Sequence, residues 1–244
     1  MTTHHATRTY PRSPIAEISC EFEFAEHARD SELQGRFFAR MRANYPRRPK
    51  PLNFETTVVG RPAHVTKMLL STGDELSHVR LGESSLSVHT LAPYPGWQTF
   101  RDRVEHALRV YLETAQPKLA MQVNLHYRNV FLIPAQSLLM ADYFNLGATI
   151  PHGFPTRLIS FVTALRSAYD EDPHKVLSLS LTATPPEREG QHAVEATLEI
   201  MTSNVKMQRD ADLTALLEVA EDLRLKAAEA FEGVITDRTR ALFR

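Results

Sequence analysis

The most informative segment of the chain is PIAEISCEFEF, residues 14–24, in which apolar and polar residues alternate. The apolar positions are Ile18, Cys20, Phe22 and Phe24, and a serine or glutamate stands between each pair. Successive side chains of a β-strand point to opposite faces of the sheet, so this alternation predicts a strand with one buried face. Because an apolar strand exposed at an edge would pair with other chains, we expect this strand to be central and Cys20 to be buried.

Downstream, apolar residues at helical spacing within residues 33–41 predict a helix, and three prolines within residues 46–51 predict an extended loop after it. Three β-type runs separated by short spacers follow, at residues 65–71, 75–81 and 85–91. Spacers this short favour antiparallel hairpins. A second helix is expected from Trp97 to about Ala115, where apolar residues recur every three or four positions.

The second half of the chain shows the same kinds of element in a similar order. Alternation predicts strands near residues 123–128, 177–183 and 194–200. Helical spacing predicts a helix over residues 158–169 and a long amphipathic helix from Leu213 to Phe231. Both halves therefore read as strand, helix, antiparallel strands and long helix.

This order of elements indicates an α+β fold, with a curved antiparallel sheet and helices packed on one face, built from two tandem similar halves. We expect a flexible N-terminal tail at residues 1–13, a first half at residues 14–117 and a second half at residues 118–244. No low-complexity linker separates the halves, so we expect them to pack as one unit.

Composition narrows the class of protein. The 244 residues are 43% hydrophobic and 23% charged, which is typical of a globular chain. Lys plus Arg (28) nearly balances Asp plus Glu (29), so no bulk field would attract nucleic acid or an anionic membrane, and we expect neither as a partner. The sequence contains no apolar run long enough to span a membrane. Cys20 is the only cysteine, which excludes an intrachain disulfide and suits a reducing cytoplasm.

Known catalytic motifs are missing from the sequence. It contains no glycine-rich phosphate loop, no nucleophile elbow and no HExxH zinc motif, so we expect no cofactor and no metal site. The weak catalytic candidates are His89 and His126, which fall on polar strand faces and would meet if those strands pair. Glu21 is a third, because it shares the polar face of the first strand with Glu17 and Glu23.

Two groups of residues are candidates for binding. Arg47, Arg48 and Lys50 form the densest positive charge, which would either contact phosphate or be a solvated connector. The aromatic group around Tyr94 and Trp97, which includes Phe100 and Tyr111, would either form a ligand cleft or pack in the core. Helical spacing favours the core for Trp97, and we therefore expect it to anchor the fold.

Four blocks of the sequence carry a resemblance to a known family. They are the opening PIAE at residues 14–17, the central YPGW at residues 94–97, the strand HYRN at residues 126–129 and the C-terminal segment at residues 231–243. In this order they resemble a sporadically distributed, largely uncharacterised bacterial family of about 240–270 residues, which has arginine and isoleucine where this chain has His126 and Arg128. The resemblance adds strand residues to the candidate binding set, which then comprises Tyr94, Trp97, Tyr127, Arg128, Asn129, Arg47, Arg48 and Lys50. The family's patchy distribution implies accessory functions, such as defence or toxin control.

Three functions follow from these observations. The first, which we favour because catalytic constellations are missing, is a non-catalytic binding or regulatory protein of the bacterial cytoplasm with a protein partner. The second is a small-molecule hydrolase or lyase with a histidine–glutamate site between the halves. The third is a nucleic-acid or nucleotide binder that uses the basic loop. A homodimer through the C-terminal helix is also expected, because apolar positions lie outside its main stripe: Leu225, Val234, Ile235, Leu242 and Phe243.

Overall fold

The computed structural model describes residues 9–25, 32–58, 61–134, 138–146, 152–153, 161–184, 191–203, 205 and 213–244. Its strands are β1 (Ile15–Ala25), β2 (Lys50–Val58), β3 (Arg61–Ser71), β4 (Ser77–Leu81), β5 (Ser85–Leu91), β6 (Leu119–Pro134), β7 (Phe161–Tyr169), β8 (Asp172–Thr184) and β9 (Gln191–Thr202). Its helices are α1 (Leu33–Met41), α2 (Trp97–Ala115), α3 (Met140–Tyr143), α4 (Leu213–Val234) and α5 (Asp237–Ala241).

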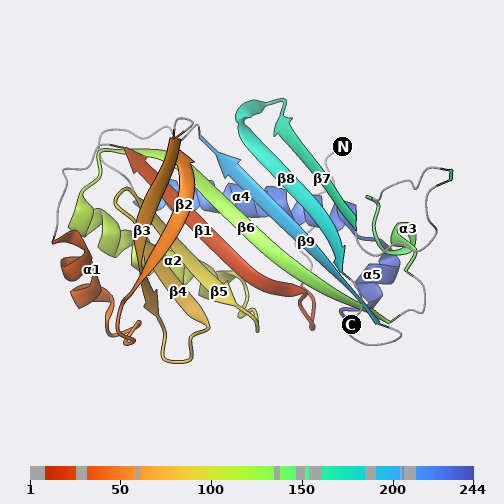
Figure 1. Cartoon of the computed structure of the whole chain (residues 1–244), viewed down its shortest axis with the longest axis horizontal. Coiled ribbons are helices and arrows are strands. Elements are labelled where there is room, and N and C mark those ends of the chain that lie inside the picture. Colours follow the sequence, from red (N-terminus) through yellow and green to blue (C-terminus); the bar gives the residue numbers. More distant parts are fainter. Residues whose placement is uncertain are drawn as a thin grey trace.

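The described strands form one antiparallel sheet in the order β2-β3-β4-β5-β1-β6-β9-β8-β7 (Figure 1). The expected α+β fold with an antiparallel sheet is therefore confirmed. β1 lies between β5 and β6, so the prediction that this strand is central is also confirmed. Outward from the β1–β6 pair, the strands follow in descending order on both sides, as β5-β4-β3 and as β9-β8-β7, and β2 adds one further strand at the first edge.

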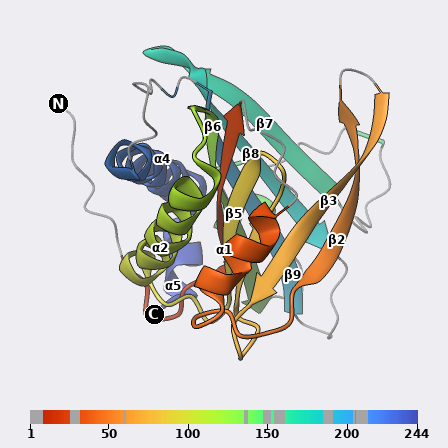
Figure 2. The same cartoon turned by 90° about the vertical axis from the view of Figure 1, so that its left-hand side faces the viewer.

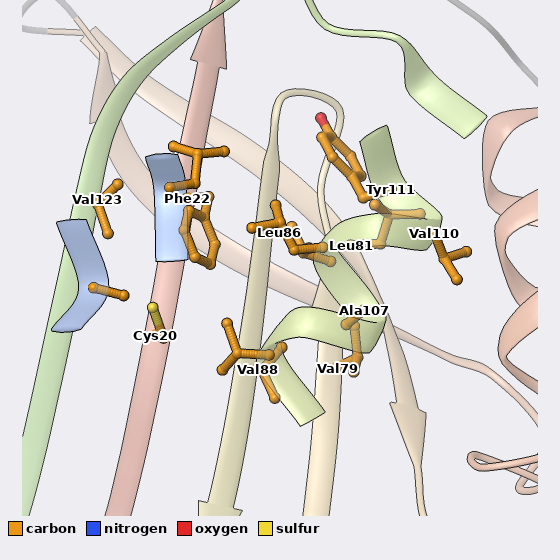
Figure 3. Packing of buried hydrophobic residues seen from close by; sticks show 14 of the residues in the cluster. Cys20, Phe22, Val79, Leu81, Leu86, Val88, Ala107, Val110, Tyr111 and Val123 are labelled. Carbon is orange, nitrogen blue, oxygen red and sulfur yellow. The ribbon is translucent and has the colours of Figure 1, made fainter. Parts of the chain in front are cut away.

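The main core lies between one face of this sheet and the helices α1, α2 and α4 (Figure 2). Ile18, Cys20 and Phe22 of β1 are completely buried in it, as the alternation predicted. Figure 3 shows Cys20 and Phe22 beside the apolar residues of β4 and β5 and the α2 residues Ala107 and Tyr111. Burial in this apolar environment raises the pKa of the Cys20 thiol.

A second, smaller core contains residues of β6, of the α3 region and of the C-terminal segment after α4. Phe131 of β6 meets Phe144, with ring centroids 5.1 Å apart, and Phe243, at 5.7 Å. Ile235 is buried in the same cluster. Of the positions that suggested a dimer, Ile235 and Phe243 therefore belong to the protein's own core, whereas Leu225 is 49% exposed.

Two elements differ from the sequence prediction. The helix expected over residues 158–169 is wrong for its described part, because Phe161–Tyr169 form the edge strand β7, paired with β8. Val162 and Leu165 are exposed there, so neither face of β7 has a complete apolar pattern and the helical spacing was coincidental. The loop expected at residues 46–51 ends early because β2 begins at Lys50, and an edge strand tolerates Pro51.

Candidate functional site

A cavity of about 670 Å³ lies on the helix-covered side of the sheet. Its walls come from residues 9–15, the loop at residues 92–97, β6 and β9 of the sheet, and α4. Five aromatic side chains line it: Tyr10, Tyr94, Trp97, Tyr127 and Phe231. Residues from both predicted halves therefore line one cavity.

The N-terminal wall of the cavity is held in place by specific contacts. The Tyr10 hydroxyl donates a hydrogen bond to Glu232 Oε1 at 2.6 Å, and the Tyr10 ring meets that of Phe243 edge-on at 5.1 Å between centroids. The amide of Arg12 donates to the carbonyl of Phe243 at 3.2 Å. Residues 9–13 were expected to belong to a flexible tail, but they carry these contacts; residues 1–8 of that tail lie outside the described residues.

The loop before α2 places Tyr94 and Trp97 at the cavity. Gly96 lies between them with φ of +93°, a backbone conformation that residues with a side chain rarely adopt. The chain turns at this glycine, and α2 begins at Trp97. Trp97 is half-buried and packs against the main core as well as lining the cavity, so it takes part in both the fold and the cleft.

A polar cluster connects Trp97 to α4. The indole Nε1 of Trp97 donates to Glu221 Oε2 at 2.6 Å. The other oxygen of Glu221 accepts from Arg224, at 2.8 Å from Nε and 2.6 Å from Nη2. The guanidinium carbon of Arg224 lies 5.4 Å from the centroid of the Trp97 ring, which is a cation–π contact. Arg224 is among the described residues that line the cavity, whereas Glu221 is not.

Two tyrosines, Tyr94 and Tyr127, line the same cavity as Arg224. Burial raises the pKa of Tyr94 to about 12 and that of Tyr127 well above its ordinary value, and the charge of Arg224 partly opposes both increases. Both phenols are therefore protonated at neutral pH. Within the described part of the chain, no hydrogen bond to either hydroxyl is found. Nearby, the buried side chain of Asn129 donates to the Ala196 carbonyl at 3.3 Å.

The opposite face of the sheet carries a different polar network. Glu17 Oε1 lies 3.0 Å from His89 Nδ1, and His89 Nε2 lies 3.1 Å from Ser87 Oγ. Glu17 Oε2 is also 3.7 Å from Nε of Arg128. The hydrogen bond from His89 lowers the pKa of Glu17 despite burial, and burial lowers the pKa of His89 although Glu17 opposes this.

The three catalytic candidates lie on this polar face but do not converge. His89 and His126 do not pair directly, because β1 separates their strands and Ser19 is in register with both. Glu21 pairs instead with Lys67, whose Nζ lies 2.6 Å from Glu21 Oε1. The side chain that contacts His89 is Glu17, which the sequence placed on the same face.

The binding candidates divide between three places. Tyr94, Trp97, Tyr127 and Asn129 line the cavity. Arg128 points to the opposite face, where it is 3.3 Å from Glu195. The basic loop lies apart from both sites: Arg47 donates to the Gly73 carbonyl at 2.7 Å and is 3.3 Å from Glu75, and Arg48 and Lys50 are exposed.

Sequence reasoning missed the contribution of α4 and of the N-terminal segment to the cavity. Arg224 was the available signal, because it falls within the spacing of the apolar stripe formed by Ala220, Ala227 and Phe231. A charged residue on the buried face of a helix requires a partner or a function. The contribution of Tyr10 had no local signal, because it depends on contacts with residues more than 200 positions away.

Neither a metal centre nor a membrane-spanning helix is found in the described residues. They contain no group of three or more histidine, cysteine, aspartate or glutamate side chains suited to hold a metal ion. No helix in the same part of the chain is both long and apolar enough to cross a membrane.

Comparison with known proteins adds little. No protein-family model and no curated protein sequence matches the chain. Among solved structures, the chain is compared with the di-domain ARO/CYC StfQ from the steffimycin biosynthetic pathway. The identity is 9%, the alignment covers 88% of this chain and 97% of that chain, and the TM-score is 0.16. A likeness this weak supports no argument about function.

Proposed function

We propose that the protein is a non-catalytic binding protein that holds a small, largely apolar molecule in the cavity beneath α4. The observation that carries this proposal is the aromatic lining of a space of about 670 Å³. Small-molecule sites commonly have volumes of roughly 300–1,000 Å³ and combine apolar walls with a few polar groups. The polar groups here include Tyr94, Tyr127, Arg224 and Asn129.

Trp97 provides a direct test of this proposal, because it is the only tryptophan of the chain and lines the cavity. The probe is N-phenylnaphthylamine, a neutral aromatic dye whose absorption overlaps tryptophan emission. We expect saturable quenching of Trp97 with one dye per chain, together with an increase in melting temperature.

Two substitutions on α4 separate the cavity from the rest of the surface. Ala228→Phe places a ring in the cavity, because Ala228 is part of its lining, and should abolish the quenching. Leu225→Phe adds a ring at an exposed position of the same helix and should leave binding unchanged. No saturable quenching of the wild type by this dye or by an anionic dye with the same rings, or equal quenching in the Ala228→Phe protein, would contradict the proposal.

A second candidate function is hydrolysis through Ser87, favoured by one observation. Ser87, His89 and Glu17 form a hydrogen-bonded chain in the order of a nucleophile, a base and a carboxylate that orients the base. Ser87 is only 3% exposed, and the aromatic cavity lies on the other face of the sheet, so binding remains the better supported function. Labelling of Ser87 by a fluorophosphonate probe would favour hydrolysis, and no labelling of folded protein would exclude it.

We also propose that the two halves are a tandem duplication. Support comes from the descending strand order on both sides of the β1–β6 pair and from the long helix that closes each half. The boundary near residue 118 and the packing of the halves as one unit remain predictions.

The biological setting is proposed from the resemblance described above: an accessory protein of the bacterial cytoplasm, with a protein partner. A homodimer through α4 also stays a prediction, now based mainly on the exposed Leu225. It requires a solution mass above 27.6 kDa that returns to that value in a Leu225→Glu variant, which light scattering measures.

A further inference from the structure

The polar part of the cavity is formed by side chains from three separate elements. Tyr94 comes from the loop before α2, Tyr127 from β6 and Arg224 from α4. All three side chains line the same cavity, and the positive charge of Arg224 partly opposes the burial that raises the pKa of both phenols. Three residues with hydrogen-bond donors, from three separate elements, therefore line one cavity.

These donors have capacity left for a ligand. The hydroxyls of Tyr94 and Tyr127 have no hydrogen-bond partner among the described residues. Arg224 uses Nε and Nη2 on Glu221, which leaves the donors of Nη1 free of that contact. Hydroxyl and guanidinium donors that line a cavity without an acceptor among the described residues are suited to a molecule that brings the acceptor.

The residues of the lining favour an anionic acceptor. Both oxygens of Glu221 are already occupied, one by Trp97 and one by Arg224, and Glu221 lies outside the lining. Among the described residues, the lining contains Arg224 and Arg12 and no carboxylate residue. Hydrogen bonds from an arginine and from neutral phenols are strongest to an ionised oxygen.

We infer that the cavity binds a planar aromatic molecule through an anionic oxygen group, such as a carboxylate, phenolate or sulfonate. The inference rests on the proposed function and names the class of ligand. The oxygen group contacts Tyr94, Tyr127 and Arg224, and the aromatic part stacks among Tyr10, Trp97 and Phe231. Trp97 and Arg224 fix each other through Glu221 and the cation–π contact, so the recognition group is formed before the ligand enters.

Two dyes with the same rings test this inference. Anilinonaphthalene sulfonate carries an anionic oxygen group, and N-phenylnaphthylamine does not. We expect the sulfonate to bind at least tenfold more tightly, measured by quenching of Trp97, and to be excluded by Ala228→Phe. The substitution Arg224→Met should weaken the sulfonate at least tenfold and change the affinity of the neutral dye less than twofold.

Two further variants distinguish a loss of dye binding from a loss of folding. Tyr127→Phe removes only the hydroxyl and should weaken the sulfonate several-fold without affecting the neutral dye. Arg48→Met, at an exposed arginine outside the cavity, is the matched control and should change neither affinity. Each variant is compared only after its melting temperature shows that it is folded.

The outcomes separate this inference from the proposed function. Equal affinity for the two dyes, or an equal effect of Arg224→Met on both, would overturn the anionic class and leave the binding function standing. Binding of the sulfonate that Ala228→Phe does not reduce would place the dye elsewhere and also overturn the inference. If neither dye quenches Trp97, the binding function itself fails.

Discussion

The two faces of the sheet differ most clearly at neighbouring residues of β6. Tyr127 points into the cavity, where its hydroxyl meets no partner among the described residues. Arg128, the next residue, points to the other face and lies near Glu17 and Glu195. On that face the two oxygens of Glu17 and the two ring nitrogens of His89 all have a neighbouring polar atom.

The difference distinguishes polar groups that stabilise the fold from those available to a ligand. Paired groups such as Glu17 and His89 contribute to stability, and changing one leaves the other without its partner. Unpaired hydroxyls such as that of Tyr127 contribute little to stability and are free to bind. Two buried atoms of the polar face, Arg80 Nε and Asn124 Oδ1, also have no hydrogen-bond partner among the described residues and are exceptions to this division.

The largest expected effect on the free energy of unfolding comes from alanine substitutions on the buried face of β1. Phe22 is completely buried, and Phe22→Ala should lower the free energy of unfolding by about 3–5 kcal/mol. The exposed neighbour Glu23 is the matched control, and Glu23→Ala should change it by less than about 0.5 kcal/mol. Urea unfolding measures both, and similar losses would contradict the assignment of the two faces.

A smaller effect is expected from the polar face itself. Glu17→Ala removes the acceptor of His89 and the partner of Arg128, and should lower the free energy of unfolding by about 1–3 kcal/mol. The same unfolding experiment measures this loss against Glu23→Ala. If Glu17→Ala is as mild as Glu23→Ala, the network does not contribute to stability.

The pH dependence of stability should follow from the same pair. His89 has a pKa below its ordinary value of 6.5, so the unfolded chain binds its proton first and stability falls as the pH drops below about 6.5. Glu17, whose pKa is below its ordinary 4.5, adds a further loss at lower pH. His89→Gln should reduce the loss between pH 7 and pH 5. The exposed His174→Gln is the control, and equal slopes in both variants would contradict this prediction.

The smallest effect is expected inside the cavity. Tyr127→Phe removes a hydroxyl that has no partner in the described chain, so the free energy of unfolding should change by less than about 0.5 kcal/mol. Thermal and urea unfolding of the two proteins provide the measurement. A loss close to that of Glu17→Ala would show that the hydroxyl is already paired, and the distinction between the two faces would fail.

Much of the fold was predictable because local patterns specify it. The alternation in β1 and the apolar stripe of α2 each depend on residues close in sequence, and α2 begins and ends where its pattern does. β7 was not predictable in this way, because an edge strand with exposed Val162 and Leu165 lacks a continuous buried face. Local patterns report burial, and they fail where burial is incomplete.

The candidate site was only partly predictable. Tyr94, Trp97, Tyr127 and Asn129 were named from motifs, and they line one cavity. Arg128 was named with them, but its strand position turns it to the other face. The cavity itself depends on α4 and on residues 9–15, which approach from both ends of the chain, and no local pattern encodes such a meeting.

The two edges of the sheet have a consequence for how the protein behaves when concentrated or stressed. β2 carries Lys50 and Pro51, a charge and a missing amide that discourage strand addition. β7 has no proline and exposes Val162 (67%) and Leu165 (54%) beside backbone groups that have one neighbouring strand in the described sheet. We therefore expect aggregation to begin at β7, by templated pairing of this edge with a second copy, and β2 to remain inert.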